Sequence, residues 1–169
     1  EAVVVVDGFY DLNKEVLKKY PAANVLNLGK NQGLAMATNL GVYHSSFDTI
    51  LVVNDDNVFP KNWDVILSQE LKPKSVLTPN QIEPNPSIFP QFIINDFGKT
   101  PKDFSVSNFQ EKEISFRRQM IDNRGSTLPF VINKYDYLAV GGWDEHYPSP
   151  HVVDWDFFLK CEYWGLQMQ

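Results

Sequence analysis

The sequence predicts one α/β domain built on a doubly wound, mostly parallel sheet with helices on its faces. Short apolar, β-branched runs alternate with helical patterns through residues 1–78, the order that produces parallel strands joined by right-handed crossovers. The runs end abruptly in polar residues or glycine. With 169 residues, 43% of them hydrophobic, the chain is long enough for a real core. We therefore treat 1–169 as a single domain.

The first elements follow from simple patterns. Residues 2–6 read as a strand that ends at Asp7-Gly8. Asn13 is expected to cap a helix that continues to about Tyr20, before Pro21. A second strand covers 24–28, and apolar or small residues at helical spacing predict a helix over 32–45.

The next elements repeat this alternation. The apolar run 49–53 predicts a strand that leads into the polar segment 54–57. Pro60 suits the first position of a helix that extends to Leu71, and 75–78 predicts a fourth strand. In such a sheet ligands bind beyond the carboxyl ends of the strands. Asp7 and the acidic pair Asp55-Asp56 both follow predicted strands, so we expect them at one edge of the sheet.

The second half has a different character. Prolines make 79–108 rich in loops, with one strand expected at 88–94, and the charged stretch 110–124 is either a short helix or a mobile segment. Residues 127–133 predict a strand and 134–140 a helix that stops at two glycines. A last helix is expected from about Asp154 to Gly165. Both ends of the chain look abrupt, so we expect a truncated domain.

The composition of the chain indicates which classes of partner and which compartment to expect. Lys plus Arg is 15 and Asp plus Glu is 21, which gives a net charge of -6, and no basic run is present. This argues against nucleic acid as a partner. The single cysteine, Cys161, lies in an apolar run; it excludes a disulfide framework and is expected to be buried in a reducing compartment. No apolar run is long enough for a membrane span, so we expect a cytoplasmic protein, with peripheral docking at the cytoplasmic membrane face left open.

The acidic segment Asn54-Asp55-Asp56-Asn57 has two possible interpretations, a metal site and a turn. Carboxylates held at the end of a buried strand suit Mg²⁺ or Mn²⁺, which would bind diphosphate oxygens and neutralise a nucleoside diphosphate leaving group. Asn and Asp are also favoured turn formers after a strand. On this motif alone both readings remain open.

Three other motifs are weaker when taken singly. The Gly- and Asn-rich loop 28–35 precedes a helix and offers N–H groups to a phosphate, but it lacks the Gly-Lys-Ser/Thr pattern of nucleotide hydrolases. Asp154 and Asp156 lie near a helix start, where one is able to act as a general base. Each of these, like the Gly-Gly-Trp-Asp-Glu stretch at 141–145, is individually more common as a turn or helix cap.

The order of these motifs along the chain resembles the inverting glycosyltransferases of family 2, which have the GT-A fold of nucleotide-diphospho-sugar transferases. The family's Asn-x-Gly and Ala-x-Asn-x-Gly helix, its relaxed Asp-x-Asp motif, its Gly-Gly-Phe-Asp-Glu turn and its later Glu-Asp-x-Asp motif all have counterparts. These are Asn31, Gly33, Ala37, Asn39 and Gly41; Asn54–Asp56; Gly141–Glu145; and Val153–Asp156.

The resemblance implies a role for each site residue. Asp56 would bind Mn²⁺ or Mg²⁺, and Asp154 would be the catalytic base. The nucleotide-sugar donor would be framed by Asp7, Lys30, Asn31, Gly33 and Asp55. The acceptor, a glycan, a lipid-linked molecule or a protein, would be bound by Trp143, Asp144, Trp155 and Asp156. Residues 1–78 would form a nucleotide-binding half and 79–169 an acceptor-side half.

Two departures from the family pattern matter. The first family strand has no counterpart here, which puts donor affinity in doubt, and Val153 replaces the Glu of the Glu-Asp pair. A sugar-1-phosphate nucleotidylyltransferase and a catalytically silent nucleotide- or carbohydrate-binding domain remain the alternatives. The aromatic residues near the end, the candidate phosphate ligands Arg117, Arg118, Arg124 and His151, and the oligomeric state are left open by the sequence.

Overall fold

The computed structural model describes residues 1–86, 92–117, 128–147 and 152–169, and within them it is an α/β protein. The strands are β1 (Val3–Val6), β2 (Asn24–Asn27), β3 (Thr49–Val52), β4 (Ser75–Leu77), β5 (Ile82–Glu83), β6 (Ile93–Ile94), β7 (Phe130–Asn133) and β8 (Gln167–Met168). The helices are α1 (Tyr10–Leu17), α2 (Leu34–His44), α3 (Trp63–Glu70), α4 (Val106–Lys112), α5 (Lys134–Val140) and α6 (Val153–Tyr163), with a 3₁₀ turn at Glu113–Phe116.

The strands are divided among three sheets in the part of the chain that the structure describes. β1 and β2 pair in parallel, as do the two short strands β5 and β6. The largest sheet has the order β3-β7-β4-β8, and β7 runs antiparallel to both of its neighbours. The α/β class is therefore confirmed, whereas one doubly wound, mostly parallel sheet is not. The physical reason is that β7 enters between β3 and β4 in the opposite direction.

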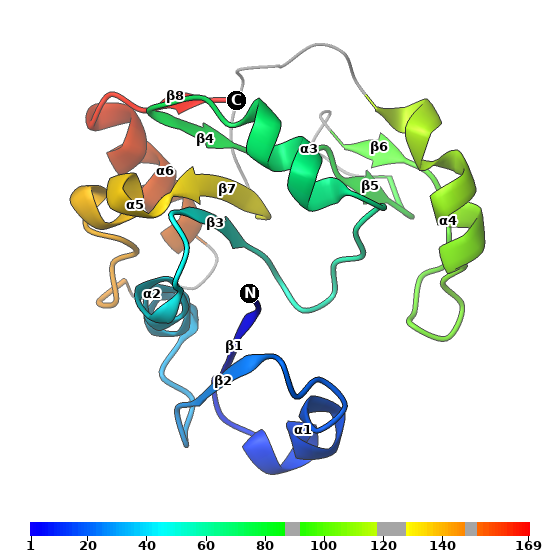
Figure 1. Cartoon of the computed structure of the whole chain (residues 1–169), viewed down its shortest axis with the longest axis horizontal. Helices are drawn as coiled ribbons and strands as arrows, with labels where there is room; N and C mark the ends of the chain where they lie inside the picture. Colours follow the sequence, from blue (N-terminus) through cyan, green and yellow to red (C-terminus); the bar gives the residue numbers. More distant parts are fainter. Residues whose placement is uncertain (87–91, 118–127, 148–151) are drawn as a thin grey trace.

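Helix α2 connects the two larger sheets. It contacts β1 on one side and β3 on the other, and Figure 1 shows it between the β1–β2 pair and the four-stranded sheet. Gly41 makes the approach to β1 possible: a Cβ at this position would lie 3.2 Å from Cγ2 of Val5. The small residue at this position of α2 thus allows close helix–strand packing.

The main core lies where the four-stranded sheet meets α5 and α6 (Figure 1). It is rich in aromatic rings from β7, α5 and α6. Its buried members are Val42, Ile50, Val76, Phe130, Ile132, Tyr137, Trp143, Val153, Phe157, Phe158, Cys161, Leu166 and Met168. By contrast α1 buries no residue, and Trp164 is 61% exposed.

Cys161 is fully buried in this core, and burial raises the pKa of its thiol to about 12. Only the thiolate is nucleophilic, so the folded protein should protect it. We expect no labelling of native protein by a thiol-specific chromogenic reagent at neutral pH, and complete labelling in denaturant. Rapid labelling of the native protein would contradict this position.

Element boundaries differ from the predictions where local geometry is unusual. α1 begins at Tyr10, after Phe9 in a left-handed conformation (φ 53°), so Asn13 is not its cap. α3 begins at Trp63, after Asn62 (φ 58°), rather than at Pro60. β5 and β8 were not predicted, α4 begins earlier than the expected helix, and residues 88–91 and 118–127 lie outside the described ranges.

No helix in the described ranges combines the length and the apolar character that crossing a bilayer requires.

Candidate functional site

The carboxylate of Asp7 joins the end of β1 to the beginning of α2. Its Oδ1 accepts a hydrogen bond from the backbone N–H of Gln32 at 2.5 Å, and its Oδ2 accepts one from Gly33 at 2.9 Å. The first N–H groups of a helix have no intrahelical partner, and the helix dipole favours an anion there. Asp7 therefore holds the start of α2, and its oxygens keep lone pairs for a further donor.

The turn Lys30–Gly33 lies on this junction. The side chain of Asn31 accepts a hydrogen bond from the same Gly33 N–H at 3.0 Å, and Gly33 (φ 94°), not Asn31, is the N-cap of α2. Gly8 allows the close approach, since a Cβ there would lie 3.1 Å from the backbone nitrogen of Asn31. Lys30 is exposed and supplies the positive charge of this turn.

The acidic segment after β3 forms a turn. The N–H of Asn57 faces the carbonyl of Asn54 at 3.5 Å, and the carboxylates of Asp55 and Asp56 are exposed. Neither carboxylate forms a hydrogen bond or ion pair with another described residue, whereas Oδ1 of Asn57 is buried without a hydrogen-bond partner. The turn that the sequence allowed is thus present, and it presents hard oxygen atoms.

These oxygens fit a divalent cation only in part. Within the described ranges no three His, Cys, Asp or Glu side chains are grouped so as to hold a metal. Mg²⁺ is commonly bound by one or two carboxylates together with substrate phosphates and water. Asp55, Asp56 and the orphaned Asn57 oxygen suit a cation of that kind, whose other ligands would come from a diphosphate.

The second group of site residues lies in the turn Gly141–Glu145. Two glycines in left-handed conformations, φ 94° and 64°, end α5 and reverse the chain. Asp144 is exposed. Its Oδ1 accepts a hydrogen bond from the backbone N–H of His146 at 2.9 Å, and this bond lowers the pKa of the carboxyl. Asp144 is therefore a negatively charged group at the surface of the turn at neutral pH.

Trp143 does not lie where the sequence analysis placed it. Its side chain is 1% exposed, and its ring lies 6.3 Å from that of Phe157 in the core. A ring with both faces packed cannot stack on a sugar. The prediction that Trp143 binds the acceptor is therefore wrong, because the ring of this residue is buried in the hydrophobic core.

Helix α6 carries the remaining acidic residues. Asp154 is half-buried in its first turn; burial raises the pKa of its carboxyl, while the N–H of Trp155, donated to Oδ1 at 2.9 Å, opposes this. Val152 is the N-cap, so Asp154 does not cap the helix. Trp155 is 58% exposed, and Asp156 forms an ion pair with Lys160 at 3.2 Å.

Lys160 also joins α6 to the turn. Its Nζ donates a hydrogen bond to the carbonyl of Gly142 at 2.8 Å. The turn with Asp144 and the helix with Asp154 and Asp156 are therefore one connected unit. No hydrogen bond or ion pair between described residues joins this unit to Asp55 or Asp56.

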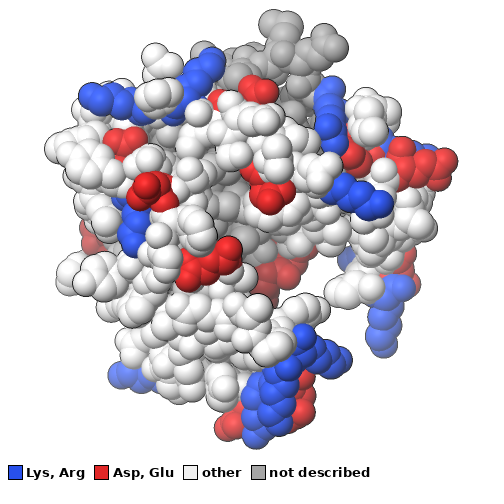
Figure 2. All heavy atoms as spheres, in the orientation of Figure 1, with Lys and Arg blue, Asp and Glu red and all other residues white. Residues whose placement is uncertain are grey.

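The sequence also offered several basic residues as candidate phosphate ligands. Arg117 forms a two-point ion pair with the buried carboxylate of Glu113, at 2.7 and 2.9 Å, which removes it as a free phosphate ligand. Arg118, Arg124 and His151 lie outside the described residues. Acidic and basic side chains are interspersed over the face shown in Figure 2, without an extended basic area.

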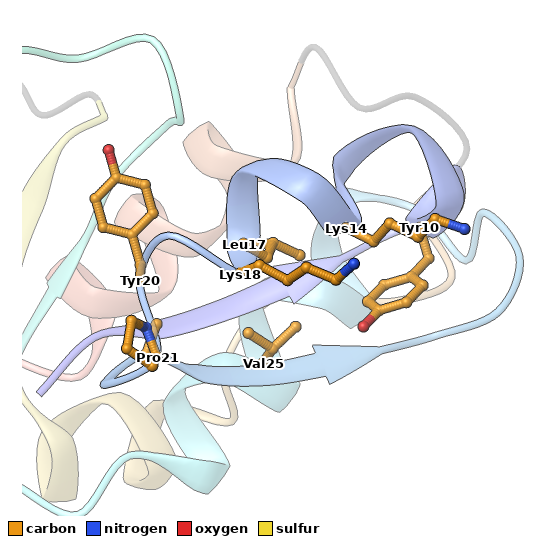
Figure 3. A pocket seen from close by; sticks show the side chains of 8 residues that line it. Tyr10, Lys14, Leu17, Lys18, Tyr20, Pro21 and Val25 are labelled. Carbon is orange, nitrogen blue, oxygen red and sulfur yellow. The ribbon is translucent and has the colours of Figure 1, made fainter.

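One shallow groove, of about 280 Å³, lies elsewhere, between α1 and β2 (Figure 3). It contains none of the predicted site residues. Its lining is Tyr10, Lys14, Leu17, Lys18, Tyr20, Pro21, Ala23 and Val25.

A family model described as glycosyl transferase family 2 matches residues 1–135. The chain belongs to glycosyl transferase family 2. The family implies the GT-A nucleotide-sugar transferase fold and a glycosyl-transfer activity that uses a nucleotide-sugar donor and an acceptor. A search of curated proteins returned no matching relative.

The matched range of this family 2 glycosyltransferase domain includes Asp7, the Lys30–Gly33 turn and Asp55-Asp56, but ends before Trp143 and Asp154. Roles on the acceptor side therefore depend on the motif order and on the geometry of α6. Sequence reasoning missed Lys160 and the part played by Asn39. The only sequence signal for Asn39 was its place in the helix motif, because its partners lie about a hundred residues later in the chain.

Proposed function

We propose that this domain is a metal-dependent, inverting glycosyltransferase that moves a sugar from a nucleotide-diphospho-sugar to an acceptor hydroxyl. The observation that carries the proposal is the position of Asp154. It is half-buried in the first turn of α6, its carboxyl has a raised pKa, and Lys160 connects its helix to the turn that bears Asp144. A carboxylate with a raised pKa is a stronger base, which is what deprotonation of a hydroxyl requires.

On the donor side, each residue offers a chemically suitable group. The free lone pairs of Asp7 suit an N–H of the nucleotide base, and Lys30 and Asn31 would contact the phosphates beside the Gly33 N-cap. Asp55 would face the ribose or the donor sugar, and Asp56 would hold Mn²⁺ or Mg²⁺. The bound cation would neutralise the charge that develops on the nucleoside diphosphate.

In the proposed reaction, Asp154 takes the proton of the acceptor hydroxyl as its oxygen attacks the anomeric carbon. The new carbon–oxygen bond forms on one face while the bond to the diphosphate breaks on the other, so the configuration inverts. Asp144, Trp155 and Asp156 would orient the acceptor, which is a glycan, a lipid-linked molecule or a protein. A lone, buried cysteine fits a reducing compartment, and we place the reaction in the cytoplasm.

Calorimetric titration with UDP, GDP and TDP, with and without Mn²⁺, tests the donor side. Asp56→Asn should weaken Mn²⁺-dependent diphosphate binding by at least about 10-fold, since the loss of even an outer-shell partner of a metal ligand costs roughly 10- to 100-fold. Asp64→Asn, on an exposed carboxylate of α3, should leave it unchanged.

Equal binding with and without Mn²⁺ would count against a metal-dependent transferase. A preference for nucleoside triphosphates over diphosphates would favour the nucleotidylyltransferase, and no nucleotide binding at all would favour a silent carbohydrate-binding domain.

A further inference from the structure

The side chain of Asn39, on α2, uses its full hydrogen-bonding capacity within the protein. Its Nδ2 donates to the carbonyl of Trp143 and to Oε1 of Glu145, both at 2.9 Å. Its Oδ1 accepts from the N–H of Trp143 at 2.9 Å and from the hydroxyl of Tyr137 at 2.7 Å. An amide has two donor hydrogens and two acceptor lone pairs; of the other side chains only Gln carries this group, and it is one methylene longer.

Three of these four bonds go to the turn Gly141–Glu145. Gly142 makes the contact possible, because a Cβ at this residue would lie 2.6 Å from Oδ1 of Asn39 and its φ is 64°. On the other side of the turn, Lys160 of α6 donates to the carbonyl of Gly142. The turn is therefore held from both sides, by Asn39 of α2 and by Lys160 of α6.

The same helix also begins at the donor side. The carboxylate of Asp7 binds the N–H of Gly33, the N-cap of α2, and Asn39 follows six residues later, roughly 9 Å along the helix axis. Figure 1 shows the loop that follows α5 lying against α2. One rigid helix thus fixes the distance between the Lys30–Gly33 turn and the Gly141–Glu145 turn.

We propose that Asn39 is a positioning residue: from α2 it fixes the Gly141–Glu145 turn, and through the contact of that turn with Lys160, in the last turn of α6, it fixes the position of this helix relative to the donor-binding junction. The effect of Asn39 on catalysis rests on the proposed function, because the residues held in place are Asp144, which would bind the acceptor, and Asp154, which would be the base. Asn39 itself touches no reacting atom.

Two substitutions separate this role from general stability. Asn39→Ala removes all three bonds to the turn. Tyr137→Phe removes a bond to the same Asn39 oxygen and leaves all three bonds between Asn39 and the turn in place, so it is the matched control. Hydrogen–deuterium exchange of the peptide that contains the Trp143 amide should accelerate at least about tenfold in Asn39→Ala and change little in Tyr137→Phe, because that amide loses its acceptor only in the first variant.

A polarity swap gives a sharper test. Asn39→Asp places a carboxylate against the carboxylate of Glu145 and should accelerate exchange as Asn39→Ala does. Adding Glu145→Gln supplies an N–H donor to the new carboxylate and should recover part of the protection. Restoration by the double variant would exclude a simple effect of residue volume.

The kinetic consequence is measured on the donor that wild-type protein turns over among UDP-glucose, TDP-glucose and GDP-mannose. Asn39→Ala should lower kcat/KM by roughly 10- to 100-fold, as loss of a supporting residue does at other sites, while Mn²⁺-dependent binding of the nucleoside diphosphate of that same donor stays within about twofold. Unchanged exchange at Trp143 would overturn the proposal, as would an equal loss of kcat/KM in Tyr137→Phe. Wild-type protein without turnover on any donor would instead contradict the proposed function, and the exchange data would still decide the role of Asn39.

Discussion

Replacing Asp154 with Asn is expected to lower kcat by about 10²- to 10⁴-fold, the usual contribution of a general base. Asn has the same shape and its amide oxygen still accepts the N–H of Trp155, but it cannot take a proton. Mn²⁺-dependent binding of nucleoside diphosphate should be retained, because the donor residues lie on other elements. Release of nucleoside diphosphate under saturating substrate measures the effect.

The control for this variant is Glu162→Gln, an exposed acidic residue on the same helix, which should keep wild-type turnover. Activity of Asp154→Asn near the wild-type rate would remove Asp154 from the mechanism. Loss of donor binding along with turnover would instead assign Asp154 to the donor site.

The raised pKa of Asp154 predicts the direction in which activity and stability change with pH. Burial raises the pKa of Asp154 above its ordinary value of 3.8, so the wild-type rate should fall as the pH drops through that raised value, where the base becomes protonated. For stability the sign is opposite. The folded state favours the protonated carboxyl, so this group lowers the free energy of unfolding as the pH rises from 3.8 through its raised pKa. Asp154→Asn should remove that decline and unfold no more easily than wild type at neutral pH.

Replacing Trp143 with Ala should reduce the free energy of unfolding by about 3–5 kcal/mol. The ring is 1% exposed and packs against Phe157, so truncation leaves a cavity in the main core. A domain of this kind has only about 5–15 kcal/mol of total stability, so the variant should be largely unfolded or aggregation-prone. Urea unfolding followed by circular dichroism measures the change.

Two companion variants distinguish packing from sugar binding. Trp155→Ala removes an exposed ring and should change the stability by less than about 0.5 kcal/mol while raising KM for the acceptor. Trp143→Phe should be much milder than Trp143→Ala, because it keeps an aromatic ring and removes an indole N–H that has no hydrogen-bond partner among the described residues. Wild-type stability in Trp143→Ala would show that the ring is not a core element.

Local pattern was a good guide in the first half of this chain. Strands at 3–6, 24–27, 49–52 and 75–77 were predicted within one residue or two, because β-branched runs bounded by turns have few alternatives. Sheet topology was not predictable in the same way. Nothing in residues 130–133 signals that they pair antiparallel with two strands from the first half, since pairing direction depends on the path of the chain between them.

In the candidate site, too, local features were predictable from the sequence and long-range contacts were not. The positions of acidic residues at element ends were readable, and Asp7, Asp55 and Asp154 do lie there. The contacts of each side chain could not be predicted in the same way. The bond of Asp7 to the start of α2, the burial of Trp143 and the bonds of Asn39 all depend on residues distant in sequence. The Gly-Gly-Trp-Asp-Glu motif has the same composition whether its ring faces a sugar or the core.

The central place of β7 has a consequence for the order in which this protein can fold during synthesis. β3 and β4 are complete when residue 77 has been made, but they do not touch each other, because β7 lies between them. Until residue 133 emerges from the ribosome, the nascent chain carries two apolar strands that lack their common neighbour. The chain must therefore keep these strand edges from pairing with other molecules while about fifty further residues, enough for several seconds of translation, are being added.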